Sequence, residues 1–319
     1  MKKLLIFAAV CISMTAQATI FRVSNLTNSG APYSSISDAM SAAMDGDTIM
    51  VDGSTTSYGP LTITKRVVIM GPGYLLSENG VSTEGTPSAQ VSTISSDDSG
   101  AAGSVIIGIE SNGEVSLLQP NMILTRCRFT SSLGIKIGTS ATNCVIHQNF
   151  IANGQVKCSV SGSYAPGTQI TNNILGYSGS NSEPVISYLT EGYIAYNTFV
   201  YPDRKDFASL TGCTVENNVC VGNQITISGN TMQNNYWPGM RNSSGITLYS
   251  DRTTDLTIKN QELSEEIAAA IADKGAFNGD DPYVISGVPA GPMIQDITVP
   301  ASVQQGSSLN VTIKLGMQR

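Results

Sequence analysis

The chain has 319 residues, a formal net charge of −7 and a charged fraction of only 13%. Such an acidic chain has no basic surface for nucleic acid or anionic lipid, so both classes of partner are excluded. The five cysteines beyond residue 100 are odd in number and form no CxxC or Cys/His spacing, which excludes a disulfide framework and a zinc site and favours buried free thiols.

The first 18 residues have the form of a secretory signal peptide. Lys2 and Lys3 precede an apolar stretch over residues 4–12, and residues 16–18, Ala-Gln-Ala, are a small-x-small cleavage site. This stretch is shorter than the roughly 18 residues that cross a bilayer, and no other is longer, so no transmembrane segment is predicted. We expect a mature chain with 15 basic and 24 acidic residues and a net charge of −9, secreted to the periplasm, the cell surface or the medium.

A short helix is predicted at the start of the mature chain. Ser35 is a suitable N-cap, and the apolar residues Ile36, Ala39, Met40 and Ala43 follow the i, i+3, i+4, i+7 spacing of one helix face. We expect this helix to cap the N-terminal end of a stack of strands, where unpaired strand edges would otherwise invite aggregation.

Short apolar strands separated by Gly, Ser and Pro turns follow this helix. The predicted strands cover residues 61–63, 67–69, 105–109, 115–118, 135–137, 156–160 and 185–189. Thin amphipathic strands with almost no helix between them are typical of a solenoid. A β-sandwich would also explain the strands, but it would not explain the repeat described next.

A six-residue pattern recurs between residues 124 and 232, with apolar residues at its first and last positions and Asn at its fourth in five of six copies. The fourth positions are Cys127, Asn149, Asn173, Asn197, Asn218 and Asn230, spaced by 22, 24, 24, 21 and 12 residues. A spacing near 22 corresponds to one coil of a parallel β-helix. We predict that each Asn occupies a left-handed bend between two strands and that the amides stack from coil to coil. The spacing of 12 means either that the last coil is shortened or that Asn230 occupies a different corner.

The predicted fold is therefore all-β, a right-handed parallel β-helix over residues 19–250 with an N-terminal capping helix. Residues 251–319 are expected to form a short C-terminal appendage. It contains a helix over 264–274 that ends at Gly275, a loop, and two strands over 294–299 and 309–315.

A run of residues near the N-terminus carries a family resemblance. It has the form Y-x-x-I-x-x-A-x-x-x-A, then G-D-x-I-x-V, then L-x-I-x-K and an apolar strand that ends in Gly. The residues that match this pattern are Tyr33, Ile36, Ala39, Ala43, Gly46, Asp47, Ile49, Val51, Leu61, Ile63, Lys65, Val67, Val68, Ile69 and Gly71. This pattern resembles the N-terminal segment of the pectate-lyase-like right-handed β-helix superfamily. The resemblance implies the fold over about residues 20–250. It leaves the activity open, because this fold hosts lyases, hydrolases and adhesins alike.

A polysaccharide lyase acting on an acidic glycan is one function to weigh. A lyase must neutralise a uronate carboxylate, with calcium or basic side chains, and remove the neighbouring proton. The candidate catalytic residues, all from two neighbouring coils, are Arg126, Arg128, Lys136, His147 and Lys157. The Trp-Ile-Asp-His and Arg-x-Pro-x-x-Arg motifs of pectate lyases are absent. No cofactor is expected, except calcium if the protein is a lyase.

A charged loop and several tyrosines are candidates for ligand binding. Asp203 and Asp206 are candidate calcium ligands, and Arg204 and Lys205 are candidate contacts for an acidic sugar. The same four charges equally form a self-compensating surface turn. Six tyrosines concentrate in this half of the chain, at positions 164, 177, 188, 193, 196 and 201. Of these, the candidate stacking platforms for sugar rings are Tyr188, Tyr196 and Tyr201.

The sequence favours a secreted or surface β-helix protein that contacts polysaccharide without catalysis. Two alternatives stay open: a polysaccharide lyase, and a structural surface protein or adhesin. No sequence feature indicates an oligomeric state.

Overall fold

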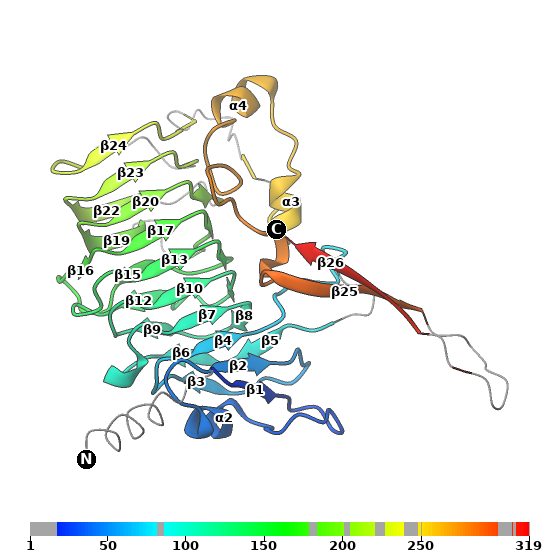
Figure 1. The fold of residues 1–319 in the computed structure, drawn as a ribbon. Coiled ribbons are helices and arrows are strands. Elements are labelled where there is room, and N and C mark those ends of the chain that lie inside the picture. The colour runs from blue at the N-terminus through cyan, green and yellow to red at the C-terminus, as the bar shows by residue number, and fades with distance from the viewer. Residues whose placement is uncertain are drawn as a thin grey trace, which may run out of the picture.

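A computed structural model of the chain describes residues 18–81, 86–178, 184–200, 205–220, 227–238, 248–249, 251–298, 308 and 311–318. Residues 1–17 lie outside this part, so the signal peptide stays a prediction. Among the described helices, none is long and apolar enough to cross a membrane. The chain forms a parallel β-helix, in which three sheets run along the long axis of the molecule (Figure 1).

In the described part of the chain, sheet A has ten strands, and the strands that neighbour each other are parallel. In order, they are β1 (Ile20–Val23), β2 (Thr48–Val51), β4 (Val68–Met70), β7 (Val105–Ile107), β10 (Ile123–Thr125), β13 (Val145–His147), β17 (Gln169–Thr171), β20 (Tyr193–Ala195), β23 (Thr214–Glu216) and β24 (Thr231–Gln233). Each coil of the chain contributes one strand to this sheet, which confirms the predicted solenoid.

Sheets B and C complete the coils. Sheet B contains β3 (Pro60–Thr62), β6 (Thr93–Ser95), β9 (Val115–Leu117), β12 (Ile135–Ile137), β15 (Val156–Cys158), β16 (Ala165–Pro166), β19 (Pro184–Thr190) and β22 (Lys205–Thr211). Sheet C contains β5 (Ala89–Val91), β8 (Ile109–Ser111), β11 (Arg128–Phe129), β14 (Phe150–Ile151), β18 (Ile174–Leu175) and β21 (Thr198–Phe199). The single strand predicted over 105–109 is two strands, because Gly108, at φ 68°, turns the chain between β7 and β8.

The core is built from the middle residue of each sheet A strand. Leu124, Ile146, Ile170, Ile194 and Val215 stack in register on five neighbouring strands, and each is 0% exposed. The residues on either side of each of them point to the outer face, because side chains alternate along a strand. The apolar positions of the repeat therefore fill the interior of the coils.

The repeat asparagines form a buried ladder between sheets A and C. Asn173 Oδ1 accepts from the backbone N of Asn149 at 2.8 Å, and Asn197 Oδ1 accepts from the backbone N of Asn173 at 3.0 Å. The prediction that these asparagines hold the left-handed bend is wrong by one residue. The bend falls on the preceding positions, such as Asn172 at φ 54° and Tyr196 at φ 55°, which leaves the ladder amides buried inside the turn.

In the described residues, the ladder continues from Asn218 to Asn235 and not to Asn230. Asn235 Oδ1 accepts from the backbone N of Asn218 at 3.0 Å, over a separation of 17 residues. Asn230 accepts instead from the backbone N of Cys213 at 2.8 Å, at another corner of the coil. Both explanations for the irregular spacing therefore hold: the last coil is shortened, and Asn230 occupies a different corner.

The N-terminal motif residues hold the predicted helix in place. Helix α2 (Ile36–Ala42) begins at its N-cap Ser35, as predicted, and lies at the N-terminal end of the coils (Figure 1). Lys65 Nζ donates to the carbonyls of Ser41 and Ala43 at 2.8 and 2.6 Å, which satisfies the C-terminal carbonyls of this helix. The motif that carries the family resemblance thus has a structural role. The capping role of the helix and the handedness of the coils stay predictions.

Residues 251–288 pack along sheet C and form what we call the C-terminal cover. This segment contains α3 (Asp255–Lys259), α4 (Glu265–Ala270) and a short 3-10 turn, η2 (Ile285–Gly287). Helix α4 confirms the predicted helix but ends four residues earlier than expected, at Ala270. Gly275 is therefore not its stop. It lies where an added Cβ would be 2.7 Å from Thr198 Oγ1 on sheet C.

Buried polar contacts fix the cover to the solenoid. The hydroxyl groups of Tyr74 and Tyr283 form a hydrogen bond across 209 residues of chain. Asp255 Oδ2 accepts from the Tyr283 hydroxyl at 2.9 Å and from the backbone N of Ser286 at 2.7 Å. Beyond the cover, β25 (Gly291–Thr298) and β26 (Thr312–Gln318) form an antiparallel hairpin that projects from the flank of the solenoid (Figure 1). The two strands overlap the ranges predicted for them, 294–299 and 309–315.

Candidate functional site

The five predicted catalytic residues do not share one face. Arg128 lies on β11 of sheet C, Lys136 and Lys157 lie on β12 and β15 of sheet B, His147 lies on β13 of sheet A, and Arg126 lies in the turn between sheets A and C. These residues therefore do not line one basic groove. A coil of about 22 residues turns through three sheets, so residues that are close in sequence point in different directions.

The two sheet B lysines stack in register but have polar partners. Lys136 pairs with Glu114, and its ammonium group holds the pKa of that carboxyl below its ordinary value. Lys157 Nζ donates to Gln155 Oε1 at 2.7 Å. The positive charge on this face is therefore partly neutralised, which weakens it as a binding strip for a polyuronate.

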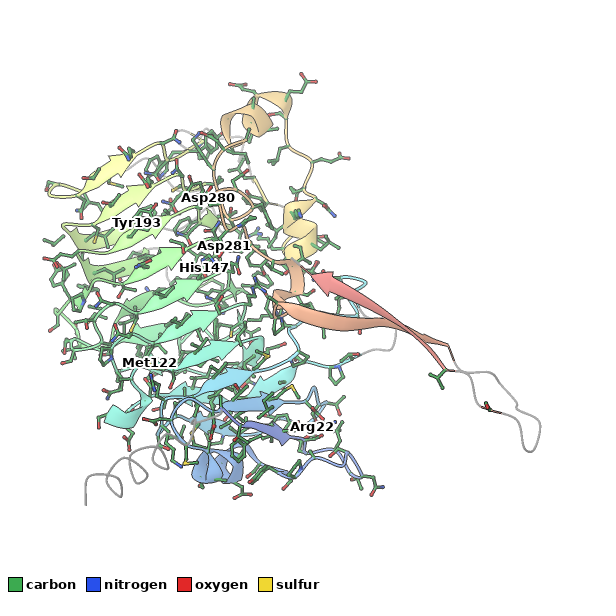
Figure 2. All side chains as sticks on the ribbon, in the orientation of Figure 1. Arg22, Met122, His147, Tyr193, Asp280 and Asp281 are labelled. Atoms are coloured by element: carbon green, nitrogen blue, oxygen red, sulfur yellow. The ribbon has the colours of Figure 1, made fainter. Side chains whose placement is uncertain are left out.

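His147 joins sheet A to the C-terminal cover. Its Nδ1 lies 2.8 Å from Thr171 Oγ1 and its Nε2 lies 3.0 Å from Asp281 Oδ2, and Figure 2 shows His147 beside Asp281. Burial lowers the pKa of His147, although the Asp281 carboxylate opposes this shift. The neutral ring then donates from Nε2 to Asp281 and accepts at Nδ1 from Thr171. Both ring nitrogens are engaged, so His147 fixes the cover and is not a free proton acceptor for a substrate.

Arg126 and its neighbour in the next coil also bind the cover. Arg126 Nη1 donates to the Val288 carbonyl at 3.0 Å, and its Nε donates to Gln148 Oε1 at 2.8 Å. Gln148 Nε2 in turn donates to Asp281 Oδ1 at 2.8 Å. These side chains dock a segment that lies more than a hundred residues further along the chain, which is a structural role.

The predicted sugar platforms have different surroundings. An added Cβ on Gly279 would lie 3.2 Å from the Tyr196 ring, so the cover packs against this ring and limits its access to ligand. Tyr188 makes an edge-on contact with Tyr164 at a centroid distance of 6.1 Å on the sheet B side. Tyr201 lies outside the described residues.

The charged loop is only partly described. Asp203 and Arg204 lie outside the described residues, and Lys205 begins β22. Asp206 is 2% exposed. In the described part of the chain, no group of three or more His, Cys, Asp or Glu side chains is arranged to hold a metal ion. The calcium ligands and the contacts to an acidic sugar stay predictions.

The outer face of sheet A carries a polar platform around Tyr193, a tyrosine that the sequence did not single out. Tyr193 is 36% exposed, and its hydroxyl donates to Glu216 Oε1 at 2.7 Å. Glu216 also accepts from Gln233 Nε2. Gln169 and Thr214 lie in register on either side of Tyr193. We call these five residues the sheet A platform, and Figure 2 places Tyr193 on the strand face.

The bond to Glu216 holds the Tyr193 ring in one orientation. Burial and the adjacent Glu216 carboxylate raise the pKa of Tyr193 to about 12, so its hydroxyl is protonated at neutral pH and donates to the carboxylate. A fixed, part-exposed ring beside amide and hydroxyl groups presents an apolar face with polar neighbours. This is the combination that a sugar ring contacts.

A separate cavity of about 430 Å³ opens on the outer face of sheet C. Its floor is a row of Gln90, Glu110 and Arg128, which lie in register on β5, β8 and β11. Ser88 and Thr55 contribute hydroxyl groups to its walls. The volume lies within the range of about 300–1,000 Å³ that is typical of small-molecule sites.

The floor of this cavity contains a largely buried ion pair. Arg128 Nη1 lies 2.8 Å from Glu110 Oε1, and the two side chains are 19% and 10% exposed. Glu110 Oε2 accepts from Ser88 Oγ at 2.9 Å. The guanidinium carbon of Arg128 lies 5.8 Å from the centroid of the Phe150 ring, which fixes the plane of the pair.

Only part of these two sites could be predicted from the sequence. Arg128 was a candidate, but Glu110 and Gln90 lie 18 and 38 residues before it, and only the strand register brings them together. Comparison with known proteins adds no further assignment. No protein-family model matches the chain, and neither a curated protein nor a solved structure matches it.

Proposed function

We propose that this protein is a secreted β-helix protein that binds polysaccharide along the outer face of sheet A without cleaving it. The observation that carries the proposal is Tyr193, an exposed ring braced by Glu216 at 2.7 Å and flanked in register by Gln169 and Thr214. Aromatic rings stack on the apolar faces of sugars, while amides, hydroxyls and carboxylates bind the sugar hydroxyl groups.

The geometry of a solenoid suits an extended ligand. Neighbouring strands of sheet A lie about 4.8 Å apart, so a polysaccharide that runs along the long axis meets a new row of side chains at each strand. The rows around Tyr193 continue to Thr231 and Gln233 on β24. A linear chain is therefore favoured over a compact ligand.

The charges favour a neutral glycan. The chain carries a formal net charge of −7, and the sheet A platform includes the Glu216 carboxylate. The basic residues that a polyuronate would need are spread over three sheets, and Arg128, Lys136 and His147 each have an acidic partner. Electrostatic repulsion would oppose a polyanion at this face. The lyase alternative therefore has less support than simple binding.

The wider assignment is part of the same proposal. The parallel β-helix and the N-terminal motif support membership of the pectate-lyase-like superfamily, and crossovers between parallel strands are right-handed in about 98% of cases. The form of residues 1–18 supports secretion to the periplasm, the cell surface or the medium.

A glycan panel tests the proposal. We expect the purified protein to bind at least one neutral polysaccharide in affinity electrophoresis and to release no unsaturated ends from acidic ones. Tyr193→Ala should weaken binding at least tenfold, about 1.4 kcal/mol. Tyr164→Ala is the matched control, because Tyr164 is 40% exposed but lies away from sheet A. Equal binding by all three proteins, or no binding to any glycan, would contradict the proposal.

A further inference from the structure

We infer that the cavity on sheet C is a second binding site, which takes one ring of a neutral sugar on the Arg128–Glu110 pair. This goes beyond the proposed function, because the cavity lies on a different sheet from Tyr193 and neither site depends on the other. A solenoid that holds a chain on one face and a single sugar ring on another would recognise both the length and an end or branch of a glycan.

The row of outward side chains on sheet C shows why the cavity exists. From Phe150 onward, this row is apolar or small and the C-terminal cover buries it: Phe150 is 1%, Ile174 0% and Thr198 2% exposed. The three preceding members of the same row are polar and line the cavity. Sheet C is thus covered where its outer face is apolar and hollowed where its outer face is polar.

A buried ion pair on the outer face of a sheet contributes little to the stability of the fold. Removing two charges from water is only partly repaid by their attraction, and apolar residues of similar volume often serve stability as well or better. The next two residues in the row, Phe150 and Ile174, are of this apolar kind. Arg128 and Glu110 at 19% and 10% side-chain exposure therefore point to a role in recognition.

The pair retains capacity for a ligand. Arg128 donates from Nη1 to Glu110 Oε1, and Glu110 Oε2 accepts from Ser88 Oγ, whereas a guanidinium group has five N–H donors and a carboxylate accepts about four hydrogen bonds. A guanidinium group and a carboxylate side by side present donors and acceptors within one small area. Two adjacent sugar hydroxyl groups, each of which both donates and accepts, match this arrangement.

The charge of the cavity selects the class of sugar. Arg128 and Glu110 cancel, and Glu78 adds a negative charge at the wall. A phosphate or a uronate would therefore meet net repulsion, while a neutral ring would not. Hydroxyl groups from Thr55 and Ser88 and the amide of Gln90 supply further polar contacts, and a volume of about 430 Å³ accommodates a sugar ring with its bound water.

Titration with monosaccharides tests the inference. The purified protein would be titrated with a panel of neutral hexoses, deoxyhexoses, pentoses and N-acetylhexosamines, with glucuronate and inorganic phosphate for comparison, by saturation-transfer NMR and calorimetry. We expect at least one neutral sugar to bind with a Kd of about 1 mM or tighter and the two anions not to bind. Binding of an anion in place of a neutral sugar, or of no neutral sugar, would overturn the inference.

Two variants locate the binding. Thr55→Trp places a large ring at the exposed rim of the cavity without disturbing the ion pair, and it should weaken sugar binding at least tenfold. Thr56→Trp is the matched control, since Thr56 is also exposed but does not line the cavity. Equal effects of the two substitutions, or none from Thr55→Trp, would overturn the location.

A third variant addresses the chemistry. Glu110→Gln keeps the shape of the side chain and removes its charge, so it should also weaken binding at least tenfold. If this variant fails to fold, as judged by circular dichroism, Thr55→Trp still decides the question. Monosaccharide binding that Thr55→Trp removes and Tyr193→Ala retains belongs to the cavity. Binding that Tyr193→Ala removes and Thr55→Trp retains would place the sugar on sheet A and overturn this inference while leaving the proposed function intact.

Discussion

Replacing Asn173 by Ala tests the ladder that joins successive coils. The Asn173 side chain is 0% exposed, and its Oδ1 accepts from the backbone N and from Nδ2 of Asn149 at 2.8 and 3.0 Å. Its Nδ2 donates to the carbonyls of Ile146 and Thr171 at 2.8 and 2.9 Å and to Asn197 Oδ1 at 3.0 Å. The substitution removes all five contacts and adds none.

The expected loss follows from which groups keep another partner. Asn149 Nδ2 still donates to the Leu124 carbonyl, and the Thr171 carbonyl still accepts from the backbone N of Gln148. The backbone N–H of Asn149 loses its amide acceptor in a buried site, which costs about 1–3 kcal/mol. With about 1 kcal/mol for the remaining lost hydrogen bonds, Asn173→Ala should lower the free energy of unfolding by about 2–4 kcal/mol.

Urea unfolding followed by circular dichroism measures this loss, and Asn235→Ala provides the comparison. Asn235 is the last ladder member among the described residues and is partly exposed, so water replaces its amide and the loss should be about 1 kcal/mol or less. The reasoning is refuted if Asn173→Ala unfolds at the same urea concentration as the wild type, or if Asn235→Ala is the more destabilised of the two.

Three further predictions concern titrating groups. Burial raises the pKa of Asp255, so folding takes up a proton there, and the stability that this group contributes grows as the pH falls and is complete below its ordinary pKa of 3.8. The unfolding free energy of the wild type, relative to that of Asp255→Asn, should therefore increase as the pH is lowered from neutral toward 3.8, and a constant difference would contradict the burial of this carboxyl group. Burial lowers the pKa of His147 and Asp281 opposes it, so Asp281→Asn should lower this pKa further in an NMR titration of the single histidine; a rise would show that the carboxylate does not act on the ring. Burial also raises the pKa of the Cys127 thiol to about 12, and all five cysteines in the described chain are buried and free. Protein that lacks residues 1–18 should therefore react with a disulfide thiol reagent only after unfolding. Fast labelling of the native protein would contradict this burial.

The repeat in the sequence was sufficient to predict the coils of the β-helix. Apolar residues at fixed positions determine which side chains enter the interior, because alternation along a strand leaves only one inward side. The spacing of about 22 residues determines the length of a coil, and four of the five repeat asparagines, Asn149, Asn173, Asn197 and Asn218, mark the same corner. The bend was misplaced by one residue because the residue that takes it is not of one type: Asn172 at φ 54° and Tyr196 at φ 55° are both left-handed, while the following Asn enters the ladder.

Strands of sheet C had a weaker signal in the sequence. Pairs such as Phe150-Ile151 and Ile174-Leu175 are buried at both positions, which is typical of a sheet covered on both faces. This pattern indicates a cover but does not say which segment supplies it. Residues 251–288 do so through side chains such as Tyr283 and Asp281, whose partners lie 209 and 134 residues away.

The sequence by itself determined the parallel β-helix, because its periodic pattern is local and each coil repeats it. Only the tertiary structure decided how the surface is arranged. Outward-facing residues are free of the packing constraint, so their positions along the chain do not show which of three sheets they occupy or whether a distant segment covers them. Glu110 and Arg128 meet in one cavity because their strands pair in register, whereas His147 binds the cover. Both facts depend on contacts between residues that are distant in sequence.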